Sequence, residues 1–332
     1  MHYKPIIIVS GEPNSIFFEI FFKAVKKKFK RTIILIGSIS LLKLQMKRFK
    51  FKKKINEVNI SILNDNKLNN KSINIINVPY TPIKSFEKIS NKSKIYIENC
   101  FKVAFKLIND GISDKLISGP ISKKSFLNKK FLGITEYVAK NFNTKKVAML
   151  IFNKKLSVCP LTTHLPLKNV AKEITKKNIY EKTILINNFY KKYFGFKPRI
   201  GVLGLNPHCE SVNNFNEDEK IIRPAVKDLI KLNYKISGPF SADTIFLKDN
   251  RKKFDVIIGM YHDQVLTPIK TLYEYDAINI TLGLPFLRVS PDHGPNEKMI
   301  GKNLSNPLSL INAISFLDKN WLELKRVWVK IF

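Results

Sequence analysis

Short runs of consecutive apolar residues recur along the chain, separated by segments with helical spacing of apolar positions. Each run is long enough for a strand buried on both faces, and the runs cover residues 5–10, 31–37, 115–120, 146–152, 156–163, 198–206, 254–261 and 277–283. Helices are expected at residues 15–29, 94–110, 168–194, 218–233 and within 306–332. Continuous apolar strands that alternate with helices favour an α/β protein with a largely parallel sheet, covered on both faces.

Two further segments have less regular patterns. Residues 43–54 are strongly basic but interleave apolar residues, as an amphipathic helix with a solvated face does. Residues 56–77 are rich in Asn and are expected to form a variable loop or a β-arm. The whole chain has 332 residues, which predicts two domains or one large α/β unit.

Composition limits the class of protein. Hydrophobic residues make up 44% of the chain, enough for a substantial core, yet no apolar run has membrane-spanning length. The N-terminus lacks the features of a signal peptide and is expected to be a first strand. The three cysteines have no CxxC spacing and lie beside apolar segments, so we expect buried free thiols and a cytoplasmic protein: Cys100, Cys159 and Cys209.

The charge is extreme, since 58 Lys and Arg against 26 Asp and Glu give a net charge of +32. A nucleic-acid partner is one explanation of such an excess. The basic residues are scattered, however, and no nucleic-acid-binding module is recognisable. Lys, Asn, Ile and Phe are all abundant together, so a general compositional bias is the favoured explanation.

Polar side chains gather directly after three of the predicted strands. Each group contains a histidine: "TTH" with His164, "NPHCE" with His208, and "YHDQ" with His262. A single such histidine is more often a hydrogen-bonded structural residue than a ligand. Three at equivalent positions, where α/β sheets bind ligands, predict a catalytic metal site for zinc or another divalent ion.

Two aspartates are candidates for supporting that site. Asp263 and Asp243 are expected to orient the histidines, to be further ligands or to transfer protons. Asp243 has an equally good alternative role as the N-cap of a helix that begins at Thr244. Lys123 and Lys270 are also candidates for proton transfer.

Cationic and amide side chains beyond His262 indicate an anionic ligand. Asn279 and Arg288 interrupt apolar stretches and need partners if they are buried, whereas Lys270 supplies a point charge. No G-x-G-x-x-G turn follows the first strand, which argues against an ordinary Rossmann nucleotide site.

Five blocks in the same order resemble the 4-hydroxythreonine-4-phosphate dehydrogenase family of pyridoxal-phosphate biosynthesis: "LTTHLPLKNV", "GLNPHCE", "GPFSADTIF", "MYHDQ" and "NITLGLPFLRVSPDHG". The resemblance implies an isocitrate/isopropylmalate-dehydrogenase-like fold with the active site in the cleft between two α/β/α domains. A cofactor-side domain is expected at 1–128 plus 276–332. A domain for metal, substrate and dimerisation is expected at 129–275.

The resemblance also implies the site residues. The family's metal ligands fall on His164, His208 and His262, the third contributed by the partner subunit of a homodimer. Zinc is the first choice of metal, with magnesium or cobalt as alternatives, and NAD or NADP is the cofactor. The family's substrate-binding positions fall on Thr135, Lys270, Asn279 and Arg288. Cofactor binding is expected in the loop 292–303, at Asp292, His293 and Gly294.

The implied reaction is oxidation of the C3 hydroxyl of 4-phosphooxy-threonine, followed by decarboxylation to 3-amino-2-oxopropyl phosphate. Four departures from the family pattern stand out. The turn "GEPNSIFFE" lacks two family glycines, Val265 replaces another, and the residues after Gly294 differ. Ile134 replaces a substrate-contacting histidine, so a phosphorylated sugar acid such as threonate 4-phosphate is the alternative substrate.

Overall fold

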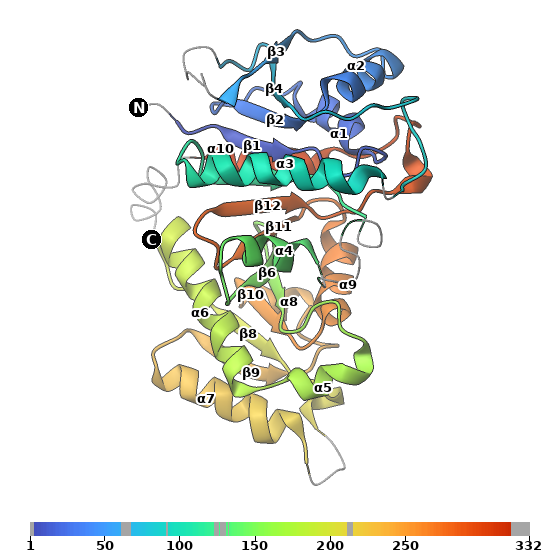
Figure 1. The fold of residues 1–332 in the computed structure, drawn as a ribbon. Coiled ribbons are helices and arrows are strands. Elements are labelled where there is room, and N and C mark those ends of the chain that lie inside the picture. The colour runs from blue at the N-terminus through green and yellow to red at the C-terminus, as the bar shows by residue number, and fades with distance from the viewer. Residues whose placement is uncertain are drawn as a thin grey trace. The chain divides into compact units, whose positions relative to one another are not determined.

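The computed structural model describes residues 3–60, 68–90, 92–122, 126, 131, 133–210 and 215–319. They divide into two compact α/β units, shown in Figure 1. The first comprises the chain up to Ile134 together with Pro285–Lys319, and the second comprises Thr135–Leu284. The predicted junctions, 128/129 and 275/276, both lie earlier in the chain than the observed ones. The later position of the second junction follows from the pairing of strand β11 (Ile278–Leu282) with β6 (Ala148–Phe152) of the second unit. The functions assigned to the two domains remain predictions.

Among the described residues, the first unit has six strands, and their order in the sheet differs from their order in the sequence. Their order is β3 (Ile55–Glu57), β4 (Ile73–Asn77), β2 (Ile33–Gly37), β1 (Ile6–Val9), β5 (Lys115–Ser118) and β12 (Leu287–Pro291). All their pairings are parallel. The helices of this unit are α1 (Phe17–Ala24), α2 (Ile39–Arg48), α3 (Lys92–Asn109) and α10 (Leu308–Asp318), with a 3₁₀ turn at Glu297–Met299.

The second unit has a mixed sheet. Its order is β11, β6, β7 (Ser157–Pro160), β10 (Val256–Gly259), β8 (Ile200–Leu203) and β9 (Ile236–Phe240). Strand β6 runs antiparallel to both neighbours, whereas β7, β10, β8 and β9 are mutually parallel. The helices are α4 (Ile134–Asn141), α5 (Val170–Glu173), α6 (Lys176–Tyr193), α7 (Arg223–Lys231), α8 (Lys248–Arg251) and α9 (His262–Tyr273), with short turns at Leu167–Asn169, Pro207–Cys209 and Asp218–Ile222.

The predicted α/β class with a largely parallel sheet is confirmed, and each apolar run predicted as a strand contains one. The predicted helix 168–194 is divided, because Thr175 caps α6 by accepting a hydrogen bond from the Asn178 amide. The loop interpretation of 56–77 is wrong at both ends, where β3 and β4 pair in register. In the basic segment 43–54 the helix is α2, which ends at Arg48.

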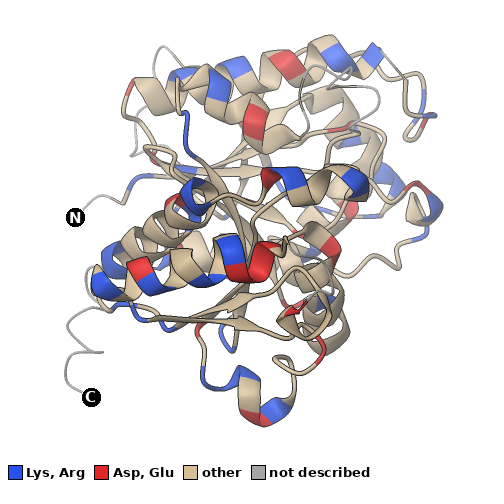
Figure 2. Cartoon of the chain, turned by 90° about the horizontal axis from the view of Figure 1, so that it is seen from below, with Lys and Arg blue, Asp and Glu red and all other residues tan. Residues whose placement is uncertain are grey.

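The cysteines, the apolar helices and the charged residues can be compared with what composition predicted. All three cysteines are buried and free. No helix in the described part of the chain combines the length and apolar character needed to cross a bilayer. Lys and Arg lie on many helices and loops, with acidic residues among them (Figure 2). This scatter gives no support to a dedicated nucleic-acid surface.

The turn after β1 shows how the departures in "GEPNSIFFE" are accommodated. Ser15 and Phe17, where the family has glycines, are 1% and 0% exposed. The Ser15 hydroxyl donates to the carbonyl of Glu12 (2.7 Å) and accepts from the Phe17 amide (3.2 Å). Side-chain hydrogen bonds therefore shape a turn that glycines shape elsewhere.

Glu12 in this turn is expected to make stability depend on pH. Burial raises the pKa of the Glu12 carboxyl, although Ser93 and the Asn14 amide donate hydrogen bonds to it. A raised folded-state pKa means that stability is fully present below the ordinary value of 4.5 and is lost as pH rises through the folded value. We therefore expect the Tm of Glu12→Gln, measured relative to that of the parent protein, to rise as the pH increases from 4 to 8. Paired thermal melts across that range measure this gain, and a constant difference in Tm would contradict it.

Candidate functional site

The three histidine-bearing strand ends are neighbours in the sheet of the second unit. Strand β10 lies between β7 and β8, parallel to both, with Gly259 opposite Pro160 and Ile258 opposite Val202. His164 follows β7, His208 follows β8 and His262 follows β10. Parallel strands end at the same edge of a sheet, so all three histidines belong to its carboxyl edge, where α/β proteins bind ligands.

Two of the histidines lie side by side. The ring centroids of His164 and His262 are 5.8 Å apart, with 39° between the ring planes. Nδ1 of His262 lies 2.6 Å from a carboxylate oxygen of Asp263. A carboxylate that accepts from Nδ1–H fixes the ring and directs the Nε2 lone pair outward, as metal-bound histidines require.

Two of the three histidines have a left-handed backbone. His164 has φ 55° and His208 has φ 56°, and Cys209 next to it has φ 62°. Non-glycine residues pay about 1–2 kcal/mol for this conformation. Such strain persists where the surroundings enforce it, and it gathers at functional sites.

The pair fits a divalent cation but does not complete its coordination. Two imidazoles that share one zinc through bonds of about 2.0–2.1 Å have centroids roughly 5–6 Å apart, which the observed pair matches. His208 is exposed. Among the described residues of one chain, no three His, Cys, Asp or Glu side chains form a set that could hold a metal. A metal held by this pair would need a third ligand from elsewhere.

The two aspartates are both exposed, but one lies on a helix and the other in a turn. Asp263 is exposed on the first turn of α9 beside His262, so it is placed to orient that ring. Asp243 is also exposed, within residues 242–246, which form turns. The next helix, α8, begins only at Lys248, so the N-cap alternative for Asp243 is wrong. Lys123, the other acid–base candidate, lies outside the described residues.

A buried carboxylate that sequence analysis did not single out supports the His208 loop. Asp218 is 0% exposed and accepts hydrogen bonds from the backbone amides of Leu205 (2.8 Å) and Asn206 (3.1 Å). It also accepts from the Asn206 side chain at 2.9 Å. A Cβ atom on Gly204 would lie 2.5 Å from Asp218, so glycine is needed there. In the sequence, the acidic run "NEDEK" at 216–220 is the signal that could have indicated Asp218.

The predicted substrate residues fall on both units. Asn279, in β11, has a buried Oδ1 with no hydrogen-bond partner in the described structure, as a ligand-binding acceptor would. Thr135 is half-buried on the first turn of α4, and Lys270 is exposed on α9. Arg288, in β12 of the first unit, is 0% exposed and donates to the Ser118 hydroxyl at 2.7 Å.

The predicted cofactor residues follow β12 in the first unit. The Asp292 amide donates to the Ser309 hydroxyl at 2.9 Å, and Nδ1 of His293 lies 3.0 Å from the Gly294 carbonyl oxygen. Gly294 has open space around its Cα. The Ile16 amide donates to the Pro295 carbonyl (3.2 Å), so this loop is bonded to the turn that follows β1.

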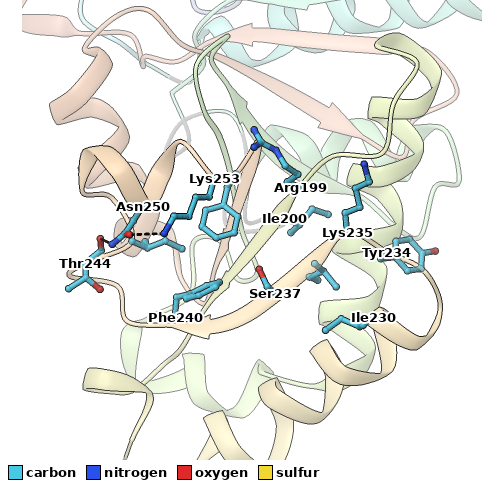
Figure 3. Close-up of a pocket in the computed structure, with 13 residues that line it drawn as sticks. Arg199, Ile200, Ile230, Tyr234, Lys235, Ser237, Phe240, Thr244, Asn250 and Lys253 are labelled. Atoms are coloured by element: carbon cyan, nitrogen blue, oxygen red, sulfur yellow. Dashed lines mark hydrogen bonds between the residues drawn. The ribbon is translucent and has the colours of Figure 1, made fainter. Parts of the chain in front are cut away.

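A separate cavity of about 530 Å³ opens beside β8 and β9 (Figure 3). Its lining includes Ile200 and Ile236, near the amino ends of these strands, and Lys253 just before β10. It contains none of the residues predicted for the site. Arg199 on its rim is paired with Asp255 at 2.9 Å, and Lys253 contacts Asn250 at 3.4 Å. The cavity is therefore distinct from the carboxyl edge that bears the histidines.

Comparison with known proteins decides the family. A sequence model described as "Pyridoxal phosphate biosynthetic protein PdxA" matches residues 29–317. The chain belongs to the PdxA family. Among its PdxA relatives, a 4-hydroxythreonine-4-phosphate dehydrogenase from Sulfurihydrogenibium sp. is 39% identical, over 97% of this chain and 98% of its own. One from Aquifex aeolicus is 32% identical, over 95% and 98%.

Solved structures agree with the PdxA assignment. A 4-hydroxythreonine-4-phosphate dehydrogenase from Burkholderia phymatum aligns with a TM-score of 0.75 and 27% identity, covering 95% of this chain and 98% of its own. A β-decarboxylating dehydrogenase from Thermococcus kodakarensis aligns with a TM-score of 0.50 and 11% identity, over 99% and 86%. The second match concerns the fold alone, and it agrees with the predicted isocitrate/isopropylmalate-dehydrogenase-like class.

Proposed function

We propose that this PdxA-family chain is an NAD(P)-dependent oxidoreductase that oxidises 4-phosphooxy-L-threonine at its C3 hydroxyl and releases carbon dioxide. A bound nicotinamide would supply the acceptor for the hydride of C3, and a base of the protein would take the hydroxyl proton. The bond from C2 to the carboxylate then breaks, and protonation of C2 gives 3-amino-2-oxopropyl phosphate. The observation that carries the proposal is the His164–His262 pair at the carboxyl edge, in a chain whose relatives are named 4-hydroxythreonine-4-phosphate dehydrogenase.

The metal would be held by His164, His208 and His262, with zinc as first choice and magnesium or cobalt as alternatives. A bound divalent cation supplies stabilisation of negative charge on the substrate oxygen. Asp263 orients His262 through Nδ1, and Asp243 and Asp263 are the proposed proton carriers. The resemblance assigns His262 to the partner subunit, but His164 and His262 lie together in one chain. We therefore propose a homodimer in which His208 of the partner subunit completes each site. Three free buried thiols suit a cytoplasmic enzyme.

Substrate and cofactor would use the remaining predicted residues. The unpartnered Oδ1 of Asn279 accepts a hydrogen bond from the substrate. Lys270 and Arg288 neutralise its phosphate or carboxylate, and Thr135 donates from the start of α4. The loop 292–303, with Asp292, His293 and Gly294, binds the nicotinamide cofactor in place of a glycine-rich turn.

The direct test is turnover by the purified full-length protein. With a divalent metal, NAD or NADP and 4-phosphooxy-L-threonine, we expect NADH or NADPH to form together with an equal amount of carbon dioxide. Reduced cofactor without carbon dioxide would remove the decarboxylation step. No turnover with any of the three metals would overturn the proposal.

Ile134 motivates a second candidate substrate, threonate 4-phosphate. Ile134 begins α4, directly before Thr135, and cannot donate the hydrogen bonds that a histidine offers there. A donor to an anion contributes about 1.5–3 kcal/mol. We therefore expect Ile134→His to raise kcat/KM for 4-phosphooxy-L-threonine by roughly 10-fold or more. Kinetics of both proteins on both compounds measure this, and a parent protein that prefers threonate 4-phosphate would favour the alternative.

A further inference from the structure

The polar residues at the carboxyl edge form a hydrogen-bonded network across three strand ends. The Thr162 hydroxyl, after β7, donates to the Met260 carbonyl at the end of β10 (2.8 Å). The Met260 amide donates to Oε1 of Gln264 (2.7 Å), and Nε2 of Gln264 donates to the Gly204 carbonyl after β8 (2.9 Å). We call Thr162, Met260, Gln264 and Gly204 the strand-end network. It links β7 to β10 and β10 to β8, the three strands that precede the histidines.

The side chains of this network are closely packed against their neighbours. Thr162 is 6% exposed, and its backbone amide also points to the Met260 carbonyl, at 3.3 Å. A Cβ atom on Gly259 would lie 3.1 Å from Oε1 of Gln264 and 2.4 Å from Val265. On the other side, Asp218 holds the two residues that follow Gly204. Glycines at 204 and 259 thus let polar side chains approach the backbone closely from both directions.

We infer that Thr162 and Gln264 are positioning residues, which set the spacing of the strand ends that carry the metal-binding histidines. His164 is two residues beyond Thr162, and His262 is two residues before Gln264. Both side chains are hydrogen-bonded to backbone groups of neighbouring strand ends, so we assign them an effect on the histidines through the chain. This inference rests on the proposed function for its metal, but the network itself is independent of it.

Thr162→Val and Gln264→Met remove the bonds while keeping side-chain size. Positions outside the network provide matched controls. Thr183, in α6, is 0% exposed and its hydroxyl has no partner in the described structure, so Thr183→Val removes a hydroxyl with no bond. Gln45 lies in the first unit and donates to the Ser85 carbonyl at 3.1 Å. Gln45→Met therefore removes a similar bond from an amide side chain to the backbone, outside the unit that carries the histidines. Thr162→Ser keeps the hydroxyl.

The experiment titrates zinc and cobalt into each metal-free protein and follows amide hydrogen exchange at Met260. We expect Thr162→Val and Gln264→Met each to weaken metal binding by about 10–100-fold. Gln264→Met should also speed Met260 exchange by more than about 10-fold. Thr162→Ser should restore the affinity, and both control variants should bind metal as the parent protein does.

Three outcomes separate the possibilities. Unchanged metal affinity in both variants would overturn the positioning role, whatever their Tm. If the two control variants lose as much metal affinity, the loss reflects general destabilisation, and this would also overturn the positioning role. If the parent protein binds no metal, the proposed function and the positioning role both fail. Faster Met260 exchange in Gln264→Met would then show that the network exists without that role.

Discussion

We expect His262→Ala to lower kcat/KM by more than about 100-fold, since the loss of this proposed metal ligand should exceed the 10–100-fold cost of removing a supporting group. His262 lies beside His164 and is oriented by Asp263, so its loss leaves one imidazole of the pair. Its side chain is 36% exposed, so the free energy of unfolding should change by less than about 1 kcal/mol. Steady-state kinetics and denaturant unfolding measure these two quantities, and zinc titration should show weaker zinc binding than in the parent protein.

Thr271→Ala provides the control for this change. Thr271 is exposed on the same helix, α9, and its hydroxyl donates to the Thr267 carbonyl at 2.9 Å. It should leave kinetics and metal affinity unaltered. A His262→Ala protein that binds zinc as tightly as the parent would remove His262 from the metal site.

The largest expected effect on stability is that of Gly11→Ala, which should lower the free energy of unfolding by more than about 4 kcal/mol. Gly11 has φ +74°, and its added Cβ would lie 2.4 Å from the Pro120 carbonyl oxygen. The Pro120 carbonyl is backbone and cannot move aside easily, since the Glu12 amide donates to the same oxygen at 2.9 Å. Denaturant unfolding of both proteins measures the difference.

Gly111→Ala separates the two causes of that loss. Gly111 has nearly the same backbone angle, φ +72°, but nothing lies within 4 Å of its added Cβ. It should therefore pay only the conformational cost, about 1 kcal/mol. Equal destabilisation by both substitutions would show that the close approach at Pro120 contributes nothing.

Much of the fold was predictable because its strands are buried on both faces. Strands such as β1, with all four residues at 0% exposure, are continuous apolar runs that few other structures allow. Two elements that were missed, α9 and β9, carry residues that usually end regular structure. Pro268 lies inside α9, and Gly238 and Pro239 lie inside β9. There the tertiary contacts outweigh local preference.

The candidate site was predictable in part for the same reason. The histidines follow strands whose neighbours in the sheet cannot be read from the chain, since β8 and β10 are adjacent in space but separated by β9 in the sequence. The family resemblance supplied the correspondence. The roles of Asp218 and Gln264 became visible only with the fold, because their partners are backbone groups of other segments. Val265, where the family has glycine, is 0% exposed in the core of the second unit, so this departure concerns packing.

The central claim, that histidines from two subunits complete one metal site, is tested most directly by mixed dimers. His208→Ala and His262→Ala chains, carrying different tags, are co-expressed and the mixed dimer is isolated. If His208 and His262 of each site belong to different subunits, one site of that dimer keeps every ligand and the other loses two. The account predicts that the mixed dimer has about half of the activity of the unmutated protein and binds one zinc. Homodimers of His208→Ala or of His262→Ala alone should be inactive. A mixed dimer that forms but neither binds zinc nor turns over substrate would contradict it.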